Sequence, residues 1–261
     1  MTIAFVVKEI TNSVLSPNIW WAFAVNDTHT RFRRSLLGPF WMTMSMSIFL
    51  AALGFVFSKL FNLPVGVYLP HVGTGLVFWT FFVGLLTESC ICFTSYSALI
   101  KNVPMPLTAH YLRLLGRHII ALGANSLVIV VIFAIFVGKV TPYSILIIPG
   151  FILFFLNCAW MGLFLAITAT RFRDVEPMVT SILQVLFFLT PIFWLPSTLP
   201  DRLAFIELNP LYHMIEALRA PYLGNPIDVL TWVILLAMLI IGWVATLFLY
   251  QKTYRKIVFW V

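Results

Sequence analysis

The sequence predicts an all-α integral membrane protein with six transmembrane helices. Its composition is 61% hydrophobic and only 10% charged, with a mean hydropathy of +1.01. Soluble domains carry about 25% charged residues, so this composition indicates a membrane protein. Apolar stretches of 18 to 28 residues also recur along the chain, close to the roughly 20 residues that cross a hydrocarbon core of ~30 Å. They are residues 36–57, 72–96, 119–137, 143–170, 178–195 and 229–250.

The basic residues predict the orientation of these spans. If six spans alternate in direction, 12 of the 16 Lys and Arg residues fall on one side: Lys8, Arg31, Arg33, Arg34, Lys101, Arg113, Arg117, Arg171, Arg173, Lys252, Arg255 and Lys256. The positive-inside rule then places both termini in the cytoplasm. The net charge of +7 therefore reflects topology, and we expect no nucleic-acid binding.

The chain divides into a cytoplasmic N-terminus (1–35), a membrane domain (36–250) and a short cytoplasmic tail (251–261). Within 18–36 the sequence is too polar to span a bilayer, yet it begins with Trp20 and Trp21 and ends with arginines. This pattern predicts an amphipathic helix lying at the cytoplasmic interface. The alternative is a linker whose arginines only anchor the first span.

Two non-spanning stretches have a structure of their own. Between the second and third spans, Pro104 and Pro106 interrupt any helix, and a short helix over 107–115 can follow. Such an exposed turn and helix suits the docking of another protein, or is simply a stiff loop. Beyond the fifth span, residues 196–228 show apolar residues at helical spacing, and Asn209-Pro210 predicts a helix start.

Few residues outside the apolar pattern suggest chemistry. Glu88 is the only acidic residue well inside a predicted span, where an ionisable group is costly and indicates a functional site. Glu88 could line a pore, form hydrogen bonds between helices or bind a proton. We favour the first two roles. We find neither a catalytic arrangement nor metal-ligand spacing, and expect the three cysteines to be buried and inert. A Walker A loop is also missing, so we expect no ATP hydrolysis by this chain and no cofactor in it.

Four motifs, in order along nearly the whole chain, resemble the type-2 ABC export permeases of bacterial polysaccharides, with the O-antigen permeases nearest and capsule and teichoic-acid permeases as close relatives. The first is Arg31-Phe32-Arg33-Arg34-Ser35-Leu36-Leu37-Gly38-Pro39-Phe40-Trp41. The second is Arg171-Phe172-Arg173-Asp174-Val175. The third and fourth are Thr190-Pro191-Ile192-Phe193-Trp194 and Leu208-Asn209-Pro210-Leu211.

The resemblance implies a multi-pass protein of the bacterial inner membrane. It would be a homodimer paired with two separate ATPase subunits, which bind ATP and Mg. Its substrate would be a polyprenyl-diphosphate-linked polysaccharide. The resemblance also makes 18–36 an interface helix and makes 201–208 with 210–222 two short re-entrant periplasmic gate helices.

The same resemblance nominates residues for each role. Candidates for docking the ATPase are Lys101, Asn102, Val103, Pro104, Pro106, Arg171, Arg173 and Asp174. Candidates for the channel or gate are Glu88, Phe82, Phe155, Trp194, His213, Glu216 and Arg219. His213, Glu216 and Arg219 recur at three-residue spacing, on the face of their helix opposite much of its apolar stripe.

Arg31, Arg33 and Arg34 stand where a diphosphate head group would arrive, although anchoring by the positive-inside rule explains the same residues. Three alternatives to polysaccharide export remain open. One is a type-2 ABC exporter of a drug or lipid, and another is a polytopic membrane transferase, for which we find no cluster of polar catalytic residues. The third, a proton-coupled carrier, depends on Glu88 alone.

Overall fold

The computed structural model describes residues 3–38, 40–103, 105–196 and 204–261, and these residues form helices with no strand. Pro39, Pro104 and the first part of the predicted 201–208 helix lie outside the described residues. The helices are α1 (Ile3–Leu15), α2 (Pro17–Arg31), α3 (Phe40–Leu60), α4 (Val65–Cys90), α5 (Cys92–Ser95), α6 (Ser97–Asn102), α7 (Leu107–Ile132), the π-helix η1 (Phe133–Val137), the 3₁₀-helix η2 (Pro142–Leu146), α8 (Ile147–Arg171), α9 (Val175–Leu189), α10 (Ala204–Leu208), α11 (Pro210–Tyr222) and α12 (Val229–Trp260).

Five segments are long and apolar enough to cross a membrane, which confirms the membrane class. They are α3, α4, α7 with η1, η2 with α8, and α12. The remaining predicted span, 178–195, overlaps α9, which has 15 residues, begins at Val175 and ends at Leu189. At 1.5 Å per residue such a helix reaches roughly 22 Å, less than the ~30 Å hydrocarbon core.

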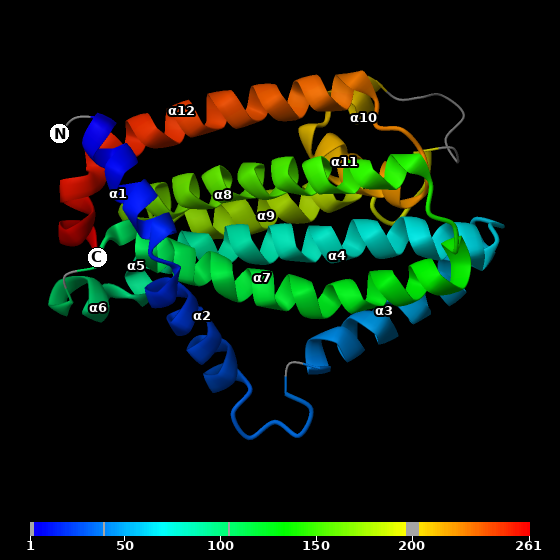
Figure 1. Cartoon of the computed structure of the whole chain (residues 1–261), viewed down its shortest axis with the longest axis horizontal. Coiled ribbons are helices and arrows are strands. Elements are labelled where there is room, and N and C mark those ends of the chain that lie inside the picture. The colour runs from blue at the N-terminus through cyan, green and yellow to red at the C-terminus, as the bar shows by residue number, and fades with distance from the viewer. Residues whose placement is uncertain (1–2, 39, 104, 197–203) are drawn as a thin grey trace.

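The long helices lie side by side, and both termini sit at one end of the bundle (Figure 1). We call this the terminal end; it carries α1, α5, α6 and the last turns of α12. The opposite, distal end carries α11, η2 and the start of α4. The helix α2 leaves the bundle at an angle, and the loop that joins it to α3 projects below the other helices in this view.

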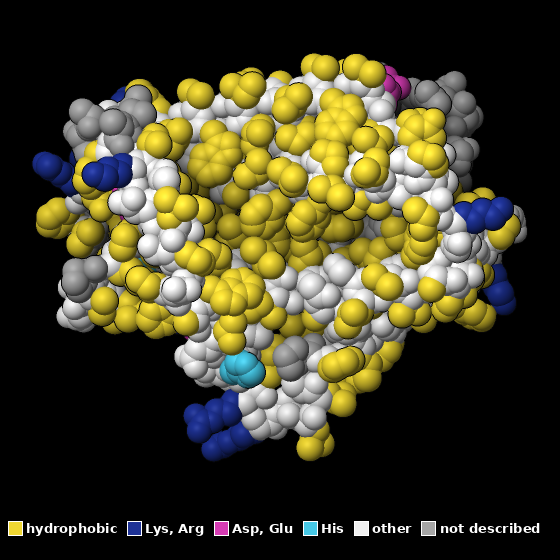
Figure 2. Space-filling view, viewed as in Figure 1, with side chains coloured by type: hydrophobic (Ala, Val, Ile, Leu, Met, Phe, Trp, Pro, Cys, Tyr) yellow, Lys and Arg dark blue, Asp and Glu magenta, His cyan; other side chains and the backbone are white. Residues whose placement is uncertain are grey.

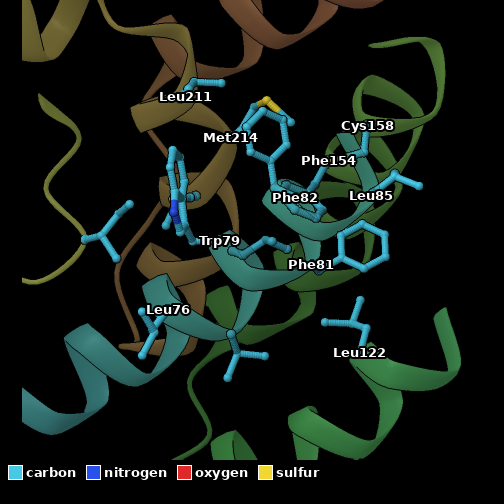
Figure 3. Close-up of a cluster of buried hydrophobic side chains, with 14 of the residues drawn as sticks. Leu76, Trp79, Phe81, Phe82, Leu85, Leu122, Phe154, Cys158, Leu211 and Met214 are labelled. Atoms are coloured by element: carbon cyan, nitrogen blue, oxygen red, sulfur yellow. The ribbon is translucent and has the colours of Figure 1, made fainter. Parts of the chain in front are cut away.

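The centre of the bundle is α4. In its most apolar stretch 72% of the residues are buried, compared with 17% in α3 and in α12. Figure 3 shows why: α4 sends large side chains toward α7, α8 and α11, where they meet Leu122, Phe154 and Met214. A helix that is apolar on every side is the one expected inside. The outer helices keep apolar side chains exposed, and hydrophobic atoms cover much of the visible surface between the two ends (Figure 2).

Three departures from the predicted elements change the terminal end. The separate short helix predicted over 107–115 is wrong, because α7 runs without a break from Leu107 to Ile132. Pro106 immediately precedes it, where its missing N–H costs nothing. The helix α12 continues ten residues beyond the predicted span, and α1 was not predicted at all. These segments pack on one another, so tertiary contacts stabilise them.

Candidate functional site

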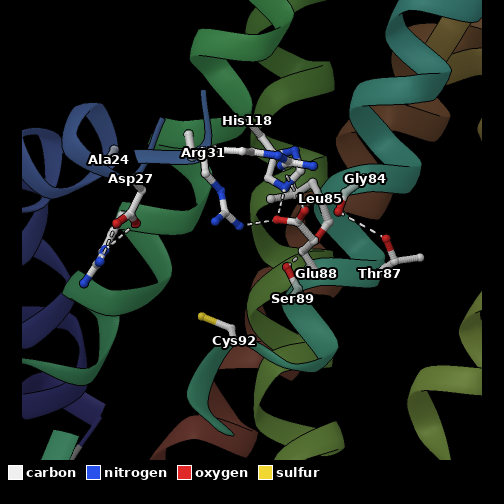
Figure 4. Close-up of polar contacts among 12 residues, drawn as sticks. Ala24, Asp27, Arg31, Gly84, Leu85, Thr87, Glu88, Ser89, Cys92 and His118 are labelled. Atoms are coloured by element: carbon white, nitrogen blue, oxygen red, sulfur yellow. Dashed lines mark hydrogen bonds and ion pairs between the residues drawn. The ribbon is translucent and has the colours of Figure 1, made fainter. Parts of the chain in front are cut away.

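A cluster of charged side chains joins α2, α4 and α7 near the terminal end (Figure 4). Glu88, in the last turn of α4, pairs with Arg117 and accepts a hydrogen bond from it. The His118 Nε2 atom is 3.0 Å from the same carboxylate, and the Arg31 Nη1 atom of α2 approaches it to 3.6 Å. Adjacent positions on α7 supply two of these partners because the helix presents its edge to α4 there. The carboxylate is thus surrounded by positive or protonatable groups.

A second ion pair lies beside the first and ties α2 to α7. Arg113 donates two hydrogen bonds to Asp27, of 2.6 and 2.5 Å. Its guanidinium also lies 4.8 Å from the ring centre of Phe23 and 4.4 Å from that of Tyr96. Two parallel hydrogen bonds with a ring on the guanidinium fix both distance and orientation. We name Asp27, Arg31, Glu88, Arg113, Arg117 and His118 the terminal-end cluster.

This geometry corrects one expectation about Glu88. The sequence made it a carboxylate without a partner, deep in a span; the structure places it near the end of α4 with three nitrogen-bearing partners. The sequence missed Arg117 and His118 because they lie 29 and 30 positions away. A carboxylate held by two arginines supports a hydrogen-bonding, helix-joining role. It gives no support to proton coupling, which needs a group that exchanges protons freely.

A cavity of about 490 Å³ opens next to this cluster. Its walls include Asp27, Thr30 and Arg31 of α2, Glu88 of α4, Tyr96, and Arg117 of α7. Both acidic and basic groups reach it, so it offers donors and acceptors to a polar group near the membrane surface. Of the three arginines nominated for a head group, only Arg31 faces this cavity. Arg33 and Arg34 are exposed on the projecting loop.

The docking candidates gather at the terminal end. Lys101, Asn102 and Val103 are exposed at the end of α6, and Pro106 is exposed at the start of α7. Arg171 at the end of α8 and Arg173 and Asp174 on the link to α9 are also exposed. The Arg171 guanidinium lies 5.1 Å from the ring centre of Trp260. The structure therefore brings two sequence-distant candidate segments to one end of the molecule.

The aromatic candidates lie inside the bundle. Phe82 is buried and packs on Trp79, with ring centres 5.6 Å apart. Phe155 is partly buried and stacks on Phe81 and Phe151. Trp194 is half-buried and donates a hydrogen bond from its Nε1 to the carbonyl of Phe188. Phe82 and Phe155 thus pack between helices, and Phe82 also borders a cavity of about 340 Å³.

At the distal end, α11 begins as predicted. The Asn209 side chain accepts a hydrogen bond from the N–H of Leu211 at 3.0 Å, and Pro210 occupies the first helical position. The prediction that His213 and Arg219 lie on a polar outer face is wrong, since both side chains are buried. The physical reason is that α4, α8 and α12 surround α11, so nearly every face of this helix is internal.

The buried polar side chains of α11 contact groups on neighbouring segments. The Nδ1 of His213 is 2.8 Å from the Thr231 hydroxyl oxygen, and its Nε2 is 2.8 Å from the carbonyl of Glu207. Arg219 donates to the carbonyl of Pro191 at 2.8 Å, and Glu216 keeps 27% of its side chain exposed. Among the residues that the structure describes, no three His, Cys, Asp or Glu side chains are arranged to hold a metal ion.

Comparison with known proteins agrees with this architecture. Two proteins of Klebsiella pneumoniae, both described as O-antigen export system permease protein RfbA, are similar to this chain. One is 25% identical over 212 residues and the other 24% identical over 211; each match covers 77% of this chain and 79% of the relative.

Residues 19–223 match the family model described as ABC-2 type transporter. The match runs from α2 to the end of α11 and so includes both polar regions described above. Together with five apolar helices, it confirms the predicted localisation, a multi-pass protein of the inner membrane. Because the family match extends over most of the sequence, the chain belongs to the ABC-2 type transporter family.

Proposed function

We propose that this chain is the permease subunit of an ATP-driven exporter that moves a lipid-linked polysaccharide, of the O-antigen type, out of the cytoplasm. The observation that carries the proposal is the family match, joined to two relatives described as O-antigen export permeases. The chain itself is not an enzyme in this proposal. Separate ATPase subunits supply the energy and hold ATP and Mg.

The proposed topology has the terminal end in the cytoplasm. Both termini lie at that end, as do the exposed basic residues of the α8–α9 link and of the α12 tail. The short helix α9 then provides the sixth crossing together with the turn and bend residues that follow it. The distal end faces the periplasm, where α10 and α11 act as gate helices. The domains remain as proposed from the sequence: 1–35, 36–250 and 251–261.

Two ATPase subunits dock, in this proposal, on the exposed end of α6 and on the α8–α9 link. Tyr96, just before α6, points its hydroxyl at Asp27 with a distance of 3.4 Å and lies against Arg113. A displacement of α6 is therefore passed to α2 through a bonded contact. This arrangement supports a role for α2 in carrying motion from the ATPase to the membrane domain.

A homodimer completes the export path. The helix α9 keeps Met178, Ile182, Val185 and Leu189 exposed at spacings of three and four residues, which makes one continuous apolar face. Because the candidate rings of Phe82 and Phe155 pack inside the single chain, the path for a polysaccharide is placed between two protomers. The exposed face of α9 suits contact with the second protomer.

The diphosphate of the lipid carrier is proposed to meet Arg31 at the mouth of the 490 Å³ cavity. Arginine matches the geometry of phosphate oxygens, and 61% of the Arg31 side chain is exposed. Its contact with Glu88 is the longest in the terminal-end cluster, so a phosphate can replace that contact. Arg33 and Arg34 anchor the loop at the membrane surface in this reading.

The decisive experiment is deletion of the gene in its native host, with complementation by the wild-type chain. The expected result is lipid-linked polymer trapped in the cytoplasm and absent from the surface, both reversed by complementation. Normal surface polysaccharide in the deletion strain contradicts the proposal and leaves export of a drug or another lipid. Co-purification of the chain with its ATPase, lost on charge reversal at Lys101 and Arg173, tests the docking surface separately.

A further inference from the structure

The five residues Thr190–Trp194 leave the helical path at the distal end and present backbone carbonyls that need donors. Three of these carbonyls each receive a hydrogen bond from a side chain of another helix. Arg219 donates to Pro191 at 2.8 Å, Tyr68 donates to Phe193 at 2.7 Å, and His71 Nε2 lies 3.2 Å from the oxygen of Trp194. In a membrane protein such donors are what make a non-helical segment tolerable.

One face of α4 carries this segment. Tyr68, His71 and Gly75 are three and four positions apart and therefore lie on the same side of the helix. A Cβ atom on Gly75 would lie 3.3 Å from the carbonyl oxygen of Ile192 and would overlap the Arg219 Nη2 atom. The segment and the guanidinium thus rest directly on the α4 backbone.

The same segment is attached to α11 at two points. At the start of the helix, the Asn209 Nδ2 atom donates to the Thr190 hydroxyl at 2.9 Å. Near its end, Arg219 holds Pro191. The helix α11 is therefore joined to α4 through residues 190–194, and we name the contacts of Arg219, Gly75 and Pro191 the distal clasp.

Arg219 is an unusual residue with which to make such a contact. Only 1% of its side chain is exposed, and its Nε and Nη2 atoms have no hydrogen-bond partner among the described residues. The Glu216 carboxylate, one turn earlier and nearer to solvent, is 3.6 Å away. Buried donors without acceptors are unfavourable. A side-chain rearrangement that brought the guanidinium closer to Glu216, or a shift of α11 that exposed it to water, would satisfy donors that are unused in the present arrangement.

We propose that Arg219 is a positioning residue that holds α11 against α4 through the carbonyl of Pro191, and that opening of the distal end requires release of this contact. That this opening serves export rests on the proposed function, whereas the Arg219 contact itself does not. The guanidinium has unused donors in the closed arrangement. A second position that satisfies those donors is therefore available to it, which allows the contact to be released.

The test uses Ile192, whose side chain is fully buried beneath the clasp. An Ile192→Cys variant is made in a background with Cys90, Cys92 and Cys158 changed to Ala, and the full-length protein is purified in lipid nanodiscs. The rate of reaction with a soluble maleimide then reports release of the segment. We expect Arg219→Ala to raise this rate about tenfold, as loss of one charged hydrogen bond predicts. Arg219→Lys, which retains a donor, should restore most of the protection.

A second variant leaves Arg219 in place. Gly75→Ala should also raise the labelling rate, because its methyl group displaces the guanidinium, and it should add little in the presence of Arg219→Ala. Gly123→Ala is the matched control, since an added Cβ there meets nothing within 4 Å. A parallel chain that keeps only Cys158, which is fully buried in the core, reports general loosening.

Unchanged labelling at position 192 in both Arg219→Ala and Gly75→Ala would overturn the proposal, as would an equal increase at Cys158. Because no ATPase and no substrate enters this assay, its result is independent of whether the exported molecule is a polysaccharide. If the export proposal fails in the deletion strain, the clasp can still be present, and the reverse also holds.

Discussion

The two ends of the bundle hold their polar groups in different ways. At the terminal end, carboxylates meet arginines directly, and several of the side chains reach solvent: 29% of Glu88 and 61% of Arg31 are exposed. At the distal end, Arg219 is fully buried and its hydrogen bond goes to a backbone carbonyl instead of a carboxylate. One end is a set of charge pairs near water. The other is a buried cation that hydrogen-bonds a carbonyl and has one carboxylate, Glu216, 3.6 Å away.

Because of this difference, the terminal end is suited to stay joined and the distal end is suited to open. Several mutually compensating charges resist displacement of any single member, so the terminal-end cluster suits a joint that must transmit motion without breaking. Arg219 holds the segment after α9 through one hydrogen bond, so the distal clasp suits a joint that opens. The predictions below test the two descriptions, beginning with the largest expected effect.

Asp27→Ala should have the largest effect on stability. It leaves the Arg113 guanidinium, which is largely buried, without a counter-ion, and loss of one partner of such a pair costs about 3 kcal/mol. Thermal unfolding of the detergent-purified protein measures the loss. Asp174→Ala, at an exposed position, is the control and should cost less than about 1 kcal/mol. Equal losses in the two variants would mean that Asp27 does not secure α2.

Glu88→Gln should cost less, about 1–2 kcal/mol, because its carboxylate is partly solvated and the amide keeps one acceptor. The cost should shrink when salt is raised from 0.1 M to 1 M, since the screening length falls from about 10 Å to 3 Å. Labelling at position 192 should not respond to salt, because Arg219 is buried. A salt-independent cost at Glu88 would remove the distinction between the two ends.

Arg31→Gln should change stability by less than about 0.5 kcal/mol, because an exposed pair at 3.6 Å contributes little. Export in the complemented deletion strain should nevertheless fall if Arg31 meets the diphosphate. Arg33→Gln, on the projecting loop, is the matched control and should leave export near the wild-type level. Normal export with Arg31→Gln, at normal membrane insertion, would leave Arg31 with an anchoring role only.

The smallest effect concerns pH. Burial raises the pKa of Glu9 above its ordinary value of 4.5, against hydrogen bonds from the Thr108 N–H and the Tyr250 hydroxyl. The folded protein therefore binds this proton more tightly than the unfolded chain. The contribution of Glu9 to stability is therefore fully present below pH 4.5 and is lost as pH rises through the folded-state pKa. Unfolding measured from pH 4.5 upward should show this loss in the wild type and not in Glu9→Gln. Identical slopes of stability against pH in the two proteins would exclude Glu9 as the source of the loss.

Parts of both polar regions were visible in the sequence. Glu88 is a candidate from the sequence because an ionisable residue among apolar ones is conspicuous, and Arg219 is one because it recurs at three-residue spacing with His213 and Glu216. Their partners were not found, because Arg117 and His118 lie on α7, Pro191 lies in the segment after α9, and no local pattern links them. The prediction that Arg219 lies on a polar outer face was also wrong, because its side chain is buried. Helical periodicity shows which residues share a face, but it cannot tell how many neighbours surround a short helix.

The sequence by itself determined the membrane class, most of the spans, the family and the start of α11 at Asn209. Each of these depends on composition, on a run of neighbouring residues or on one capping side chain, all of which are local properties. Only the tertiary structure decided that α4 is the central helix, that Asp27 and Glu88 join α2 to the bundle, and that Arg219 holds the segment after α9. Those contacts connect residues far apart in the chain, and their geometry arises only when the helices pack together.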